Sequence, residues 1–251
     1  MTAEAPRSRG GQQFIPRPDW WRLGGPAPWT AARAGLIGGP IGGPDTLDRS
    51  EPGDRFDLRH LLRVVEARDP GRLVPPFPGA RNAAVLIVLH DGARGPEALF
   101  TKRAQHLRNH RGEISFPGGR MEPGETAVET ARREAWEEVA LDPSIVQVHG
   151  ELDHLSTVVS NSYIVPIVAT VRERPELVAH PGEVDRVLWV PLDELSHADT
   201  YREEWWGPPE LERPIHFFEL EDETIWGATA RMLHQLLRLA HGVDEPEPPT
   251  W

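Results

Sequence analysis

The sequence predicts an α+β fold in which hairpin strands and a small number of helices pack as layers. Residues 83–89 form a short run rich in β-branched residues, which is typical of a buried strand. Asp91-Gly92 then supplies a turn, and residues 99–101 fit the hairpin partner of that strand. Apolar spacing over residues 127–139 and 226–240 adds two helices, and the chain shows no internal repeat. Hairpins combined with few helices favour an α+β layered domain.

Composition divides the chain into three segments. Residues 1–54 are dominated by Gly and Pro and show little periodicity, which predicts a largely irregular N-terminal extension. One domain is expected over residues 55–242. Residues 243–251 combine proline with acidic side chains, so we expect them to form a disordered tail.

Tryptophans interrupt the otherwise featureless extension. Trp20, Trp21 and Trp29 would leave large apolar area in water if the segment were free, so we expect this part to dock, on its own domain rather than on a partner. The extension nevertheless has no evident core-forming pattern. Removal of the residues up to about Gly53 is therefore expected to leave the fold intact.

The remaining elements of the domain follow from apolar spacing. Leucines and valines recur at helical intervals over residues 57–67, and Pro70-Gly71 ends that helix. Further strands are expected at residues 146–152, 163–171, 187–190 and 215–220.

Charge and residue types exclude several classes of partner. A net charge of -12 argues against general binding of nucleic acid or of an anionic membrane, because both need a basic surface. No apolar run approaches the roughly 20 residues that cross a bilayer, and no secretory signal is expected. The chain has no cysteine, which excludes disulfides and cysteine nucleophiles and fits a cytoplasmic location. The oligomeric state stays open, with a homodimer among the options.

The helix expected over residues 127–139 carries the candidate chemistry. Thr126 and Glu129 have the spacing of a capping box, so the helix should begin at residue 127. Glu134, Glu137 and Glu138 then fall on one side of it, because their spacing is i, i+3, i+4. The core-facing stripe beside them consists of Val128, Ala131, Ala135 and Val139.

Two interpretations of this acidic side are open. Most charged helical faces are simply solvated. However, like charges at i, i+4 destabilise a helix, and these lie in its last turns, where the helix dipole favours cations. Hard oxygen ligands in such an arrangement suit Mg²⁺ or Mn²⁺. We therefore favour a divalent-cation site.

This segment resembles the Nudix box, G-x5-E-x7-R-E-U-x-E-E-x-G-U, where U is aliphatic. The late glycine of the pattern is Ala140 here, which puts the end of the helix in doubt but not the carboxylates. The resemblance implies a Nudix fold, a mixed β-sheet sandwiched between α-helices. The matching residues are Gly119, Glu125, Arg133, Glu134, Ala135, Glu137, Glu138 and Leu141.

The resemblance also implies a role for each box residue. Glu134, Glu137 and Glu138 correspond to metal-binding and catalytic carboxylates, and the carbonyl of Gly118 would add a further ligand. A downstream acidic residue is expected from a loop, and Glu183 stands at the expected place; as a lone carboxylate it could equally be a solvated side chain. Glu125 and Arg133 correspond to an ion pair that supports the site.

The segment before the box indicates the substrate. It resembles the signature of the coenzyme A pyrophosphatase subgroup, L-L-T-x-R-[SA]-x3-R-x3-G-x3-F-P-G-G, with Phe100 in place of the second leucine. A basic island in this acidic chain consists of Lys102, Arg103, Arg108, Arg111 and Arg120. We expect Lys102, Arg103 and Arg108 to bind phosphate groups there, and we favour this over the alternative of scattered surface arginines. The resemblance implies hydrolysis of coenzyme A, with bound Mg²⁺ or Mn²⁺, to 3',5'-ADP and 4'-phosphopantetheine.

Two other functions fit the same residues. One is hydrolysis of a different nucleotide, such as ADP-ribose, NADH or a nucleoside triphosphate. The other is a catalytically silent binding or regulatory protein, which the intact set of carboxylates disfavours. We expect Trp205, Trp206 and Trp226 to pack internally rather than to stack on an adenine.

Overall fold

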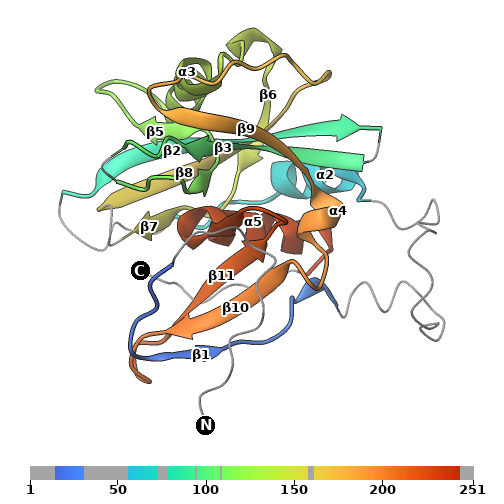
Figure 1. The fold of residues 1–251 in the computed structure, drawn as a ribbon. Helices are drawn as coiled ribbons and strands as arrows, with labels where there is room; N and C mark the ends of the chain where they lie inside the picture. The colour runs from blue at the N-terminus through green and yellow to red at the C-terminus, as the bar shows by residue number, and fades with distance from the viewer. Residues whose placement is uncertain are drawn as a thin grey trace.

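The structure, a computed structural model, describes residues 15–30, 56–72, 79–93, 95–107, 109–157 and 161–243. Arg108, and the predicted acidic tail beyond residue 243, lie outside these ranges. Figure 1 shows four layers: helix α3, a large sheet, the helices α2 and α5, and a second sheet. No helix in the described ranges is long and apolar enough to cross a membrane.

The large sheet is mixed. β2 runs parallel to β8 and antiparallel to β3, and the predicted hairpin is confirmed, with Gly92 opposite Gly95 in its register. The path is β4-β3-β2-β8-β6, while β5 pairs with β2, β7 with β8 and β9 with β3. The strands are β2 (Arg81–Gly92), β3 (Gly95–Arg103), β4 (Ile114–Ser115), β5 (Gly118–Arg120), β6 (Gln147–Glu151), β7 (Leu155–Thr157), β8 (Ser162–Thr170) and β9 (Val184–Pro191).

The second sheet is antiparallel and has the order β1-β10-β11-β12. Its strands are β1 (Trp21–Leu23), β10 (Tyr201–Trp206), β11 (Arg213–Glu219) and β12 (Thr224–Trp226). The sequence predicted only β11, because the charged and aromatic pattern of β10 lacks the alternation of a half-buried strand.

Helices cover both faces of the large sheet, as an α/β/α sandwich requires. Alternate residues of β2 point to opposite faces: Leu86 packs in the cluster beneath α3 (Ala127–Val139), and Ile87 packs in the cluster with α2 (Leu58–Ala67) and α5 (Gly227–Ala240). The predicted fold class is confirmed. The described residues also include two short elements, α4 (Leu192–Leu195) and a 3-10 turn (Pro143–Ile145).

The N-terminal segment is part of this core. β1 pairs with β10, with Trp21 opposite Trp206, and Trp29 is completely buried in the cluster around α5. The docking expected from the tryptophans is therefore confirmed for Trp29, whereas Trp20 is 63% exposed. The burial of Trp29 argues against the expectation that the segment can be removed without loss of the fold, because removal would take a core side chain away.

Candidate active site

Helix α3 begins and ends as local sequence chemistry dictates. At its start, Thr126 Oγ1 accepts from the Glu129 N–H at 3.2 Å, and the Glu129 carboxylate accepts from the Thr126 N–H at 2.8 Å, so the capping box is confirmed. At its end, Ala140 adopts the left-handed conformation with φ 56°, the conformation that glycine would take without strain. The alanine substitution has therefore kept the helix end.

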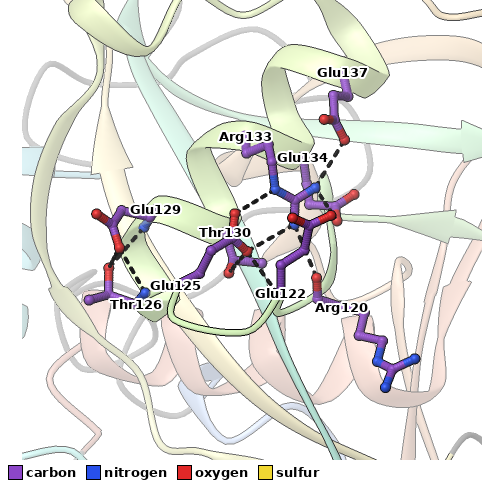
Figure 2. A network of polar contacts seen from close by, with 9 residues as sticks. All are labelled: Arg120, Glu122, Glu125, Thr126, Glu129, Thr130, Arg133, Glu134 and Glu137. Atoms are coloured by element: carbon purple, nitrogen blue, oxygen red, sulfur yellow. Dashed lines mark hydrogen bonds and ion pairs between the residues drawn. The ribbon is translucent and has the colours of Figure 1, made fainter.

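Arg133 joins the loop before α3 to the carboxylates on the helix (Figure 2). Its guanidinium donates to Glu125 at 2.7 Å, to Glu134 at 2.9 Å and to Glu137 at 3.0 Å. The hydrogen bond from Arg133 is the largest cause that lowers the pKa of the Glu125 carboxyl to about 2, with the backbone N–H of Glu122 second. The expected pair of Arg133 and Glu125 is thus present, and it orients Glu134.

Glu134 and Glu138 are carboxylates in a confined space beside β5. Glu138 is 3% exposed and accepts from the Gly118 N–H at 3.3 Å, while the Arg103 guanidinium lies 3.9 Å away. Glu134 lies directly against the backbone of Gly119, where a Cβ would stand only 2.5 Å from the carboxylate carbon. Glycine at this position therefore makes room for the Glu134 carboxylate.

Burial makes both carboxylates unfavourable as free anions. Desolvation raises the pKa of Glu138 to about 8, against the opposing attraction of Arg103 and the hydrogen bond from Gly118. Desolvation also raises the pKa of Glu134, although Arg133 lowers it. The charges of Glu134 and Glu183 each raise the pKa of Glu138 further. These acidic groups therefore lie near enough to repel one another.

Backbone hydrogen bonds bring Glu183 to this place. The N–H groups of Val178 and His180 donate to the carbonyls of Val139 and Glu138 at the end of α3, at 3.0 and 2.8 Å. The carbonyl of Glu183 accepts from the Ala104 N–H just after β3, at 2.9 Å. The loop is therefore tied to both α3 and β3. Glu183 itself is exposed.

The donor set fits a divalent cation. Hard carboxylate oxygens are the preferred ligands of Mg²⁺, and a cation beside Glu134 and Glu138 would offset both their burial and their repulsion. Glu137 is 54% exposed in its side chain and is held by Arg133. The described residues contain no ready-made cluster of acidic or histidine side chains around one point, so ligation by Glu137 needs its side chain to leave Arg133.

The three basic residues predicted to bind substrate have different surroundings. Arg103 lies next to Glu138 and lines a pocket. Lys102 instead donates to the buried Glu223 at 2.6 Å and does not line that pocket. Arg108 lies outside the described residues. Of the two described residues, the structure brings Arg103 to the carboxylates and pairs Lys102 with Glu223.

A pocket of about 540 Å³ opens beside the carboxylates. Gly118 and Arg103, both in contact with Glu138, line it, and so do Trp206 and Trp226 of the second sheet. These two indoles also contact each other, at 6.4 Å between ring centroids. Both therefore pack against a neighbour, as expected, and also line the pocket.

The pocket also contains residues that sequence reasoning missed. Arg213 and Arg231 line it, and neither was predicted to bind substrate. Arg231 lies in α5, a helix that apolar spacing predicted without indicating a ligand. Arg213 carries no sequence signal, because its place depends on the pairing of β11 with β10.

Known proteins share the segment that builds this site. The NUDIX domain family model matches residues 80–209. The chain is 33% identical over 198 residues to Nudix hydrolase 3 of Caenorhabditis elegans, covering 72% of this chain and 82% of that protein. It is 34% identical over 193 residues to the uncharacterized Nudix hydrolase NudL of Pectobacterium atrosepticum, covering 74% and 95%.

Solved structures of the same family are also similar. The crystal structure of RenU, a Nudix hydrolase from M. Smegmatis, is 22% identical with a TM-score of 0.41, covering 48% of this chain and 76% of that one. The matched family model and the relatives both include the whole of α3 and the loop before it. The chain belongs to the Nudix hydrolase family and is an enzyme that hydrolyses phosphoanhydrides.

Proposed function

We propose that this hydrolase cleaves the pyrophosphate linkage of coenzyme A or its derivatives, with Mg²⁺ or Mn²⁺ bound at the carboxylates. The observation that carries the proposal is the continuity of the pocket. It begins at Gly118 and Arg103, which contact Glu138, and extends to the second sheet and α5. A substrate with its pyrophosphate at the carboxylates would place a long attached group in the pocket.

Arg103 is suited to bind the pyrophosphate. Its side chain is 29% exposed, and its Nε is buried without a hydrogen-bond partner among the described residues. A guanidinium can donate two parallel hydrogen bonds to phosphate oxygens, and a phosphate oxygen would then satisfy the unpartnered Nε–H of Arg103. The upstream segment that resembles the coenzyme A pyrophosphatase signature contains this arginine.

The carboxylates have two roles, binding of the cation and activation of the attacking water. Glu134, Glu137 and Glu138, with the Gly118 carbonyl, would hold the cation, which supplies charge neutralisation on the phosphoryl oxygens when bound. Either Glu134 or Glu183 positions or deprotonates the attacking water. Burial raises the pKa of Glu134 above its ordinary value, which makes this carboxylate a stronger base than a solvated glutamate. The ion pair of Arg133 and Glu125 fixes the loop before α3 to the helix.

A product analysis tests the substrate. The purified full chain is incubated in buffer that contains Mg²⁺. Each reaction contains one compound, either coenzyme A, ADP-ribose, NADH or a nucleoside triphosphate, and the products are identified by mass. We expect 3',5'-ADP and 4'-phosphopantetheine from coenzyme A at the highest kcat/KM. The Glu138→Gln protein is the control for contaminating activity. Faster cleavage of ADP-ribose or NADH would reassign the substrate, and no turnover of any of these compounds would contradict the proposed function.

A further inference from the structure

The start of helix α5 also lines the pocket. Gly227, Ala228 and Thr229, the first residues of this helix of 14 residues, line the pocket. Trp226 occupies the N-cap position and makes no side-chain hydrogen bond to the helix. The first N–H groups of an α-helix have no partner within the helix and carry its positive dipole end. The part of the pocket at the start of α5 therefore suits an anion.

Two buried polar groups in the same pocket lack partners. Ser156 is 7% exposed and its hydroxyl makes no hydrogen bond within the described part of the chain. The indole N–H of Trp226 is likewise buried without an acceptor there. Both residues line the pocket. A buried unpartnered donor costs free energy unless a ligand or water satisfies it, so these two groups point to a ligand with hydrogen-bond acceptors.

The charge of the pocket is opposite to that of the chain. Arg213 and Arg231 line it together with Arg103, whereas Glu113 is the acidic residue among its lining residues and is paired with His110 at 2.9 Å. The whole chain has a net charge of -12. A cationic, partly enclosed pocket in an acidic protein attracts and concentrates anions locally.

Arg103 is assigned to the pyrophosphate, whereas Arg213 and Arg231 line the pocket from β11 and α5. Arg213 lies opposite Trp206 in the pairing of β10 with β11, and Arg231 lies one turn into α5. We propose that these two arginines, the start of α5 and Ser156 bind a second phosphate of the substrate, a monoester that is not cleaved. The inference rests on the proposed function, since coenzyme A carries such a group at its 3' position.

Two substrates that differ only in the second phosphate test the proposed phosphate site. A general loss of folding would affect both substrates equally. Coenzyme A and dephospho-coenzyme A differ by the 3'-phosphate alone. We expect Arg213→Gln and Arg231→Gln each to raise KM for coenzyme A by about tenfold or more, the scale of one charge-assisted contact, with little change in kcat. KM for dephospho-coenzyme A should stay within about twofold. Ser156→Ala should show the same selectivity with a smaller effect.

A matched control and a binding measurement complete the test. Arg59→Gln removes an exposed arginine of α2 that does not line the pocket, and it should change neither KM. Calorimetry on the full chain with 3',5'-ADP and 5'-AMP should show tighter binding of 3',5'-ADP, and Arg213→Gln should abolish the difference.

The outcomes separate the two proposals. Equal losses for both substrates in the arginine variants, with equal binding of 3',5'-ADP and 5'-AMP, would overturn the phosphate site and leave the hydrolase assignment standing. If the unaltered protein cleaves neither form of coenzyme A, the proposed substrate fails. The binding preference for 3',5'-ADP and its loss in Arg213→Gln would then still decide the phosphate site.

Discussion

The indole of Trp29 donates a hydrogen bond to the carbonyl oxygen of Ser196 at 3.0 Å, across 167 positions of sequence. The side chain is completely buried and stacks near Phe218 and His241. A residue of the Gly/Pro-rich extension is therefore a core residue of the domain, between the second sheet and α5.

Trp29→Ala should destabilise the protein by about 3 to 5 kcal/mol, because it leaves a cavity in the core and an unsatisfied Ser196 carbonyl. Denaturant unfolding measures the change, and Trp20→Ala, at a side chain that is 63% exposed, is the control and should change stability by less than about 0.5 kcal/mol. Equal stability of the two variants would show that the N-terminal segment is dispensable after all.

Activity should require a divalent cation and disappear with EDTA.

Glu137→Gln and Glu138→Gln should each lower kcat by at least about 100-fold. Each change removes a negative charge that would hold the cation, and the cation stabilises the charge of the transition state. Steady-state kinetics with added Mg²⁺ measure the loss. The result for Glu137 is the more informative one, since its carboxylate is bonded to Arg133 in this structure. Near-normal rates in both variants would place the cation elsewhere.

Gly119→Ala should impair catalysis more than stability. The added Cβ would stand 2.5 Å from the Glu134 carboxylate and would displace it, and a misplacement of about 1 Å can cost roughly 100-fold in rate. We expect a loss of that order in kcat with an unfolding free energy near that of the parent. Gly25→Ala, where a Cβ would meet no atom within 4 Å, is the matched control. An unchanged kcat in Gly119→Ala would mean that the Glu134 position is unimportant.

Ala140→Gly should stabilise the protein by up to about 1 kcal/mol, since Ala140 holds a left-handed conformation with φ 56° that glycine adopts without steric cost. Ala127→Gly, a change within the helix, should have the opposite sign. Thermal unfolding compares the two. Destabilisation by both changes would show that the helix end is not strained.

The pair of Glu125 and Arg133 should make stability depend on pH in acid. The pKa of Glu125 is lowered from 4.5 to about 2 in the folded protein, chiefly by the hydrogen bond from Arg133. A lowered pKa means that the contribution is complete above the unfolded value and is lost as pH falls from about 4.5 to about 2. The difference in unfolding free energy between the parent and Glu125→Gln should shrink across that window. A difference in unfolding free energy that does not change with pH would show that the ion pair of Glu125 and Arg133 does not contribute to stability.

Local chemistry in the sequence determined helix α3 and its carboxylates. The capping box of Thr126 and Glu129 fixes where the helix begins, and the period of 3.6 residues then places Glu134 and Glu138 relative to the core stripe without any distant contact. The β2 and β3 hairpin is similarly local, because a turn joins its strands. These features need only neighbours in the chain, so the pattern alone predicted them.

The tertiary structure determined which basic and tryptophan side chains lie near the carboxylates or in the core. Lys102 and Arg103 are adjacent in sequence, yet strand alternation and the nearby Glu223 direct Lys102 into an ion pair while Arg103 reaches Glu138. Arg213 has no local pattern that indicates its place. The tryptophans predicted that Trp29 docks but not where it packs, because both positions depend on strand pairing and core packing between segments far apart in the chain. Long-range contacts of this kind are set by the whole fold, and the sequence pattern around each residue does not contain them.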